Sequence, residues 1–108
     1  MKARIEEKEY DILDMRGWRS FIGLMFNDMN EIDGALIYGN SIWMPFVKRP
    51  LTLIFLDDEN KILQVDFAIP ITTNPRTWKT YSCKKASKCL ELKEKINPSI
   101  GERVLFSK

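Results

Sequence analysis

Two apolar runs separated by four polar residues constrain the fold more than any other feature of this chain. Residues 51–56 are apolar on both faces apart from Thr52, and residues 61–68 alternate apolar and polar side chains. The four residues between them, Asp-Asp-Glu-Asn, are typical of a turn. We therefore expect a hairpin whose first strand is central and covered on both sides. In its second strand, Leu63, Val65 and Phe67 would lie on one face, and Gln64 and Asp66 on the other.

Weaker strand signals lie on either side of this hairpin. Residues 1–14 are polar with scattered apolar positions, which predicts an edge strand or a frayed start. Residues 35–38 and 42–47 are short apolar runs separated by the turn pair Gly39-Asn40. Pro45 stands inside the second of these runs and indicates an edge strand or a bulge. A last strand is expected after Gly101, with Val104 and Phe106 facing the core.

Two segments bear on helix content. Over residues 16–25 the apolar side chains recur at i, i+3, i+4 and i+7, which predicts one short helix facing the core; they are Trp18, Phe21, Ile22 and Met25. Residues 87–95 fit either a strand or a helix. As a strand, the segment points Leu90 and Leu92 inward and Cys89, Glu91 and Lys93 outward. We favour the strand, because a helix would leave Leu92 off its apolar face.

These elements predict a mainly β fold, either a compact β-sandwich of jelly-roll type or a partly closed barrel, with one short helix near residues 16–25. The length of 108 residues fits a single domain over 1–108. The chain has no signal-like apolar leader and no run long enough to span a membrane, so a cytoplasmic location is expected. The two cysteines are then reduced thiols.

The sequence offers no catalytic constellation. Histidine is absent, which removes the commonest general base and the commonest metal ligand. Cys83 and Cys89 lack the spacing of redox or zinc motifs, and the packing role is favoured over a reactive thiol promoted by nearby lysines. The acidic residues 57–59 are better explained as turn residues than as cation ligands. We expect no metal and no cofactor, and we lean against an enzyme.

Two surfaces remain as candidate sites. The stretch 76–95 carries seven basic against two acidic side chains and contains two aromatic residues. Single-stranded nucleic acid is bound by aromatic platforms beside basic groups. The candidate contacts for nucleic acid are Trp78, Lys79, Tyr81, Lys84, Lys85 and Lys88. The other surface is the run interrupted by Pro45, where Trp43, Met44 and Phe46 could line a ligand groove or a partner contact.

The order of several short motifs resembles the family catalogued as domain of unknown function 192, over about residues 16–106. The motifs are Gly23-Leu24-Met25-Phe26, Gly34, Trp43-Met44, Pro50-Leu51 before a strand that ends in Asp57, Leu90-Glu91-Leu92, and Gly101, Glu102 and Val104. The resemblance implies a compact β-sandwich of jelly-roll type, in a bacterial and archaeal family whose members are often exported and for which no activity is established.

The chain departs from that family where a shared site would lie. After Trp-Met the family commonly shows Lys-Asn-Thr, whereas this chain has Pro45, Phe46 and Val47. After Pro-Leu the family has Asp, whereas this chain has Thr52. The resemblance therefore carries the fold and not a binding role.

The sequence favours a non-enzymatic β-domain that binds a small ligand or a protein, or serves a structural role. Its contacts would be Trp43, Met44 and Phe46, with Glu91 on a nearby strand as a polar contact. The alternatives are single-strand nucleic-acid binding through residues 76–95 and a thiol-dependent enzyme.

Overall fold

The computed structural model describes residues 1–15, 32–39, 41–43, 50–69 and 80–107. Within these ranges the chain forms strands and turns, so the expected mainly β class is confirmed. The strands are β1 (Lys2–Ile5), β2 (Lys8–Met15), β3 (Gly34–Tyr38), β4 (Ser41–Trp43), β5 (Leu51–Leu56), β6 (Ile62–Ala68), β7 (Thr80–Ser82), β8 (Lys88–Leu92) and β9 (Leu105–Ser107).

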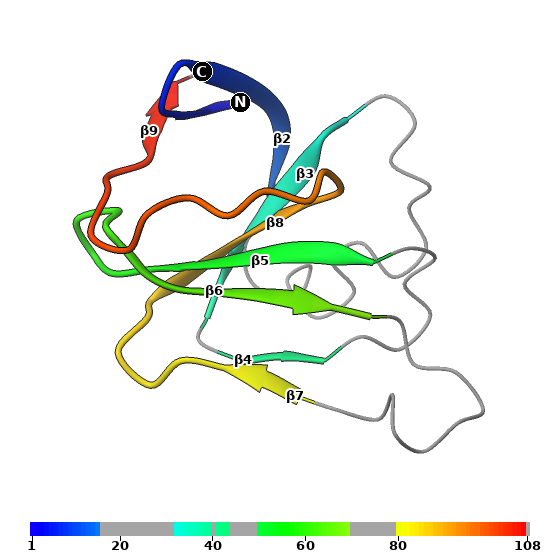
Figure 1. Cartoon of the computed structure of the whole chain (residues 1–108), viewed down its shortest axis with the longest axis vertical. Helices are drawn as coiled ribbons and strands as arrows, with labels where there is room; N and C mark the ends of the chain where they lie inside the picture. The colour runs from blue at the N-terminus through cyan, green and yellow to red at the C-terminus, as the bar shows by residue number, and fades with distance from the viewer. Residues whose placement is uncertain (16–31, 40, 44–49, 70–79, 108) are drawn as a thin grey trace.

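Seven strands form one curled sheet in the order β6-β5-β8-β3-β2-β1-β9, and β4 pairs with β7 in a separate small sheet. The β2–β3 pairing is parallel, and the other pairings in the large sheet are antiparallel. Both termini lie at one end of the molecule, and β4–β7 lies at the other (Figure 1).

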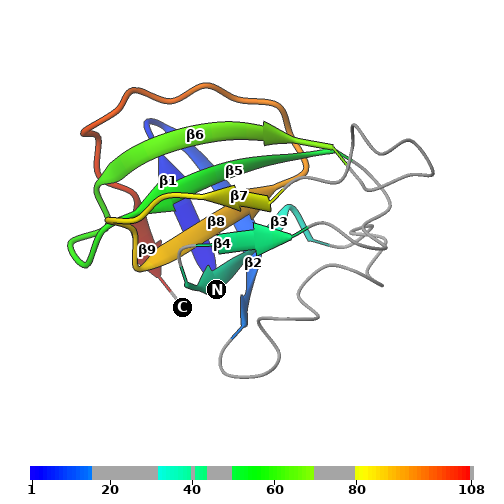
Figure 2. The same cartoon turned by 90° about the horizontal axis from the view of Figure 1, so that it is seen from below.

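The two ends of the large sheet approach each other, so the architecture is that of a partly closed barrel. The amide of Ile62 at the start of β6 donates to the carbonyl of Glu102 over 2.8 Å, and the amide of Gly101 donates to the carbonyl of Ile62 over 2.7 Å. An isolated bridge joins Lys61 to Arg103, just before β9. In Figure 2 the segment that leads from β8 to β9 passes outside β6, at the rim of the curled sheet. Of the two architectures expected from the sequence, this is the barrel.

The sheet buries an apolar cluster on each face. We call the cluster enclosed by the curled sheet the barrel core; it consists of Ala3, Ile5, Tyr10, Ile12, Leu36, Ile54, Leu56, Ile62, Leu90, Leu92 and Val104. We call the cluster on the opposite face the outer core; it consists of Ala35, Ile37, Leu51, Leu53, Phe55, Ala68, Tyr81, Ala86 and Cys89. Since Tyr81 comes from β7, the small sheet packs on the outer face.

The hairpin predicted from the two apolar runs is confirmed. All six residues of β5 are buried, and β5 pairs with both β6 and β8. In the turn, one carboxylate oxygen of Asp57 accepts the amides of Glu59 and Lys61 over 2.8 and 3.0 Å, and Asn60 takes a positive φ of 65°. Asp and Asn are the residues whose side chains and backbones suit these roles.

One detail of that hairpin was predicted wrongly. Leu63, Val65 and Phe67 do not share a core face, because a bulge lies where Phe55 pairs with Gln64 and Leu56 with Ile62. A bulge places an extra residue in one strand and changes the alternation of side chains. Leu63 consequently packs against the outer core and Val65 against the barrel core, while Phe67 is exposed.

The first residues form a hairpin rather than an edge strand or a frayed start. Ile5 pairs with Lys8 across a two-residue turn, and Glu6 in that turn has a φ of 57°. Two-residue turns between antiparallel strands need positive φ to match the strand twist. β1 is not at an edge, because β9 pairs with its other side. Val104 is buried and Phe106 packs against the barrel core, as predicted, although β9 begins only at Leu105.

The segment 87–95 contains the favoured strand, β8, but its position was misjudged. β8 pairs with β3 along one edge and with β5 along the other. Its two faces are also covered, with Leu90 and Leu92 in the barrel core and Cys89 in the outer core, so Cys89 and Glu91 do not point outward to solvent. Gly34 permits this close pairing, because a Cβ at that position would lie 1.8 Å from the carbonyl oxygen of Glu91.

The helix expected over residues 16–25 lies outside the described residues. In the part of the chain that the structure describes, no helix has the length and apolar character needed to cross a membrane.

Candidate functional site

Glu91 is a buried carboxyl group near the middle of the large sheet. It lies on β8, directly opposite Ala35 of β3 and Leu53 of β5, both of which belong to the outer core. Its side chain is only 3% exposed. The sequence resemblance had placed Glu91 near a possible binding surface, and the structure shows that it lies among apolar groups.

Burial raises the pKa of Glu91 from 4.5 to about 8. No cation or hydrogen-bond donor among the described residues lowers it again. A carboxyl group in an apolar environment keeps its proton because the charged form loses its hydration. At neutral pH Glu91 is therefore mostly a neutral acid, with one O–H donor and a carbonyl acceptor.

The thiol beside Glu91 is held in its unreactive form. Cys89 lies two residues earlier on the same face of β8 and is completely buried. Burial, and then the charges of Glu91 and Asp66, raise its pKa well above the ordinary value. Cys83 is partly buried, packs against the outer core, and forms no disulfide with Cys89. A nucleophilic cysteine needs the opposite environment, one that stabilises the thiolate.

A row of polar groups borders the outer core at β6. The amide nitrogen of Gln64 donates to the Asp66 carboxylate over 2.6 Å and to the carbonyl of Ser82 in β7 over 3.0 Å. Since Asp66 pairs with Leu53, which in turn pairs with Glu91, one row across the sheet carries two acidic side chains. No sequence pattern indicates this arrangement, because only the strand register brings Asp66 and Glu91 into one row.

The fold separates the aromatic residue Tyr81 from the basic residues of the stretch 76–95. Tyr81 is 5% exposed, belongs to the outer core, and accepts the amide of Ile69 at its hydroxyl over 3.2 Å. It therefore presents no exposed ring on which a base could stack. Lys88 donates to the side-chain oxygen of Asn60, and Lys84 and Lys85 are exposed in the turn before β8. Trp78 and Lys79 lie outside the described residues.

The apolar residues expected to line a groove are only partly described. Trp43 contributes backbone to β4, where it pairs with Thr80 of β7. Met44 and Phe46 lie outside the described residues. β4 nevertheless lies next to the outer core, because its partner strand β7 contributes Tyr81 to that cluster.

The acidic turn is used internally. Asp57 accepts two backbone amides, which lower its pKa, and Glu59 forms exposed ion pairs with Lys61 and Arg103 at 3.7 and 3.6 Å. Among the described residues, no group of three or more acidic or cysteine side chains is arranged to hold a metal ion.

Comparisons with known proteins establish the fold alone. No family model matches the chain, and no curated protein matches it significantly. A protein of unknown function from Novosphingobium aromaticivorans DSM 12444 has the same fold, with a TM-score of 0.76 and 15% identity over 97% of this chain and 84% of that one. A candidate transcription regulator from Sinorhizobium meliloti 1021 has a TM-score of 0.73 and 17% identity over 96% of this chain and 89% of that one.

Proposed function

We propose that this chain is a non-enzymatic binding domain, and that Glu91 is the polar contact of a small, mainly apolar ligand on the outer face of the sheet. The observation that carries the proposal is the burial of this carboxyl among apolar side chains, opposite Ala35 and Leu53. As a neutral acid it would donate a hydrogen bond to a carbonyl or ether oxygen of the ligand, and accept one from a hydroxyl.

The energetic cost of Glu91 supports a functional role. Burying a carboxyl group costs free energy because the group loses its hydration, and a leucine of similar volume would pack there without that cost. Titratable groups perturbed by burial are concentrated at functional sites. The surrounding side chains are apolar, as in most small-molecule sites, where a few polar groups fix the orientation of the ligand.

Trp43, Met44 and Phe46 complete the proposed site. β4, which contains Trp43, borders the outer core through its pairing with β7. Large apolar side chains in and after β4 would provide the contact area, and a hydrogen bond to Glu91 would orient the ligand. A protein partner inserting an apolar side chain on this face is the second form of the same proposal.

A thermal-shift panel of neutral sugars, nucleosides, amides and short peptides tests the proposal. A ligand at about 100 times its dissociation constant adds about 2.7 kcal/mol, which raises the Tm of a chain this size by about 10 °C or more. We expect the shift to shrink in Glu91→Gln, which keeps a donor and an acceptor, and to vanish in Glu91→Leu.

Asp66→Asn is the matched control, because Asp66 lies in the same row of the sheet but only partly buried at β6. It should keep the full shift. Equal binding by Glu91→Leu and the unmodified chain would remove Glu91 from the site. A panel without any shift would overturn the small-ligand form of the proposal. The protein-partner form is then tested by pull-down, in which a partner captured by the immobilised wild-type chain should be lost with Glu91→Leu.

The alternatives have less support. For nucleic acid, Tyr81 is buried, and of the described lysines proposed as contacts Lys84 and Lys85 are exposed while Lys88 is partly buried. For a thiol enzyme, burial keeps Cys89 protonated. Membership of the domain of unknown function 192 family stays a proposal, supported by the order of the sequence motifs.

A further inference from the structure

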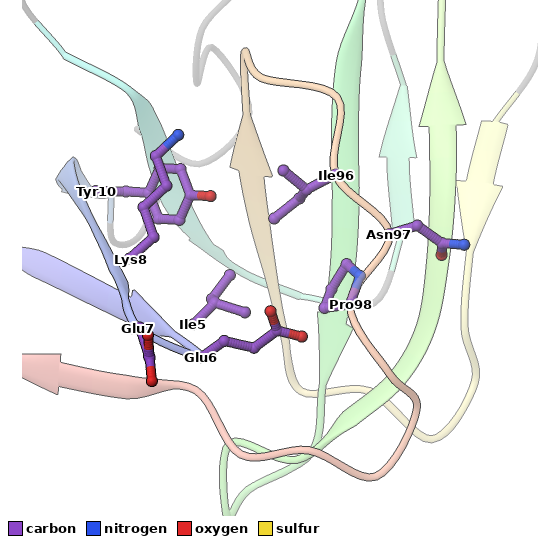
Figure 3. Close-up of a pocket in the computed structure, with 8 residues that line it drawn as sticks. All are labelled: Ile5, Glu6, Glu7, Lys8, Tyr10, Ile96, Asn97 and Pro98. Atoms are coloured by element: carbon purple, nitrogen blue, oxygen red, sulfur yellow. The ribbon is translucent and has the colours of Figure 1, made fainter.

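A cavity opens at the mouth of the barrel, on the opposite side of the sheet from Glu91. It has a volume of about 340 Å³ and lies between the β1–β2 turn and the segment 96–98, in the size range of small-ligand sites. We call it the mouth pocket; it is lined by Ile5, Glu6, Glu7, Lys8, Tyr10, Ile96, Asn97 and Pro98 (Figure 3).

The mouth pocket has an apolar floor that belongs to the barrel core. Ile5 and Tyr10 are members of that cluster, and Ile96 packs against it from the opposite wall. Thr52 fixes this wall: its hydroxyl donates to the carbonyl of Glu94 over 2.8 Å and accepts the amide of Ile96 over 3.4 Å. The shape of the pocket is therefore set by strand β5 and not by the exposed segment alone.

The charges at one end of the pocket neutralise each other. The Lys8 ammonium group donates to both carboxylate oxygens of Glu94 over 2.7 Å, and the Tyr10 hydroxyl donates to the same carboxylate. Glu94 is thus satisfied, and Lys8 has no second anion among the described residues. A ligand entering the pocket would meet a closed ion pair at this end.

The other end carries a carboxylate that is not neutralised. Glu6 forms no side-chain ion pair among the described residues. The Glu6 side chain reaches across the pocket toward Pro98, whereas the carboxylate of the adjacent Glu7 points away (Figure 3). With Lys8 paired to Glu94, the lining carries a net negative charge from Glu6 and Glu7.

We propose that the mouth pocket binds a small organic cation, an amine with an aliphatic or aromatic body. The ammonium group would pair with Glu6, and the apolar body would lie on Ile5, Tyr10 and Ile96. An anionic ligand of the same shape would be repelled by Glu6 and Glu7, and a neutral one would gain only the apolar contact. This site lies on the opposite face of the sheet from Glu91 and does not depend on the function proposed for it.

Backbone-amide NMR titration with hexylamine tests the proposal, with hexanol and hexanoate as the neutral and anionic probes of equal length. We expect hexylamine to bind with a dissociation constant on the order of 1 mM and to shift the amides of residues 5–10 and 96. Hexanol should bind about fivefold more weakly, and hexanoate should leave these amides unmoved.

Glu6→Gln and Glu7→Gln form a matched pair, because the two glutamates are adjacent in the same exposed turn and either change keeps the shape of the side chain. We expect Glu6→Gln to weaken hexylamine binding about fivefold and to bring it level with hexanol, while Glu7→Gln changes it less than twofold. An equal loss of hexylamine affinity in both variants would mean that the general negative charge of the turn attracts the amine, and it would overturn the specific role of Glu6. Equal binding of all three probes, or shifts outside residues 5–10 and 96, would overturn the site.

Discussion

The two faces of the large sheet are built from the same strands but tolerate very different chemistry. Tyr10 and Thr52 are buried on the barrel side, and the hydroxyl of each has a hydrogen-bond partner. The outer core instead surrounds the carboxyl of Glu91 and the thiol of Cys89, and burial raises the pKa of both. The polar groups named on the enclosed face are hydrogen-bonded, whereas the outer face buries a carboxyl group at a cost in stability. Groups perturbed by burial in this way are concentrated at functional sites.

The largest expected effect concerns the pH dependence of stability from Glu91. Its pKa rises from 4.5 to about 8 on folding, so the folded chain holds the proton more tightly than the unfolded chain. The free energy of unfolding therefore falls as pH rises from 4.5 to 8, by on the order of 4 kcal/mol, and then levels off. Urea unfolding at pH 5, 6.5 and 8 should show this fall in the wild type and not in Glu91→Gln.

The pH series stops at 8 so that Cys89, the other perturbed group on this face, stays mostly protonated in both states. Identical pH profiles for wild type and Glu91→Gln would mean that the Glu91 carboxyl is ionised in the folded chain, and the contrast between the two faces would then disappear.

Gly34→Ala should disturb both faces at once, because the β3–β8 pairing is common to them. The added Cβ would meet backbone, the Glu91 carbonyl oxygen at 1.8 Å, so the strands must separate. We expect a loss of about 3 kcal/mol in the free energy of unfolding, measured by urea denaturation. A loss under 1 kcal/mol would show that β3 can shift without disturbing the sheet.

Thr52→Val tests how the barrel side is held closed. The substitution keeps the shape of the side chain and removes both hydrogen bonds to the segment 94–96. We expect a cost of about 1.5 kcal/mol, and faster hydrogen exchange at the Ile96 amide than at amides of β8. Unchanged exchange at Ile96 would show that packing of Ile96 alone holds the segment.

Lys8→Met should have the smallest effect. The Lys8–Glu94 pair is short, but its side chains are 60% and 44% exposed. We expect a loss below about 1 kcal/mol that disappears in 1 M salt, measured by thermal unfolding at both ionic strengths. The Lys8 ammonium nitrogen also lies 5.3 Å from the centre of the Tyr10 ring. A larger, salt-independent loss would indicate that contact of the Lys8 side chain with this ring matters more than the ion pair.

The sequence predicted the candidate site only in part. The Leu-Glu-Leu motif points to Glu91, but alternation along the strand predicts that its side chain faces outward. That prediction assigns Leu90 and Leu92 to a core and assumes that the sheet has only one buried face. The mouth pocket gave no signal, since Ile5 and Ile96 are 91 positions apart in the chain and carry no shared pattern. The sequence predicts Tyr81 as a stacking surface because basic residues lie near it in the sequence, whereas the residues around it in the folded chain are apolar.

What the sequence determined by itself was local. The turn at Asp57–Asn60 and the strands on either side of it follow from side-chain hydrogen bonding to the backbone and from alternation, which act over a few residues. Only the tertiary structure decided that β8 lies between β3 and β5, that residues 101–104 close the barrel against β6, and that a second core covers the outer face. Those outcomes depend on strand pairing and burial between segments far apart in the chain. The free energies of such contacts depend on both segments together, so neither segment alone predicts them.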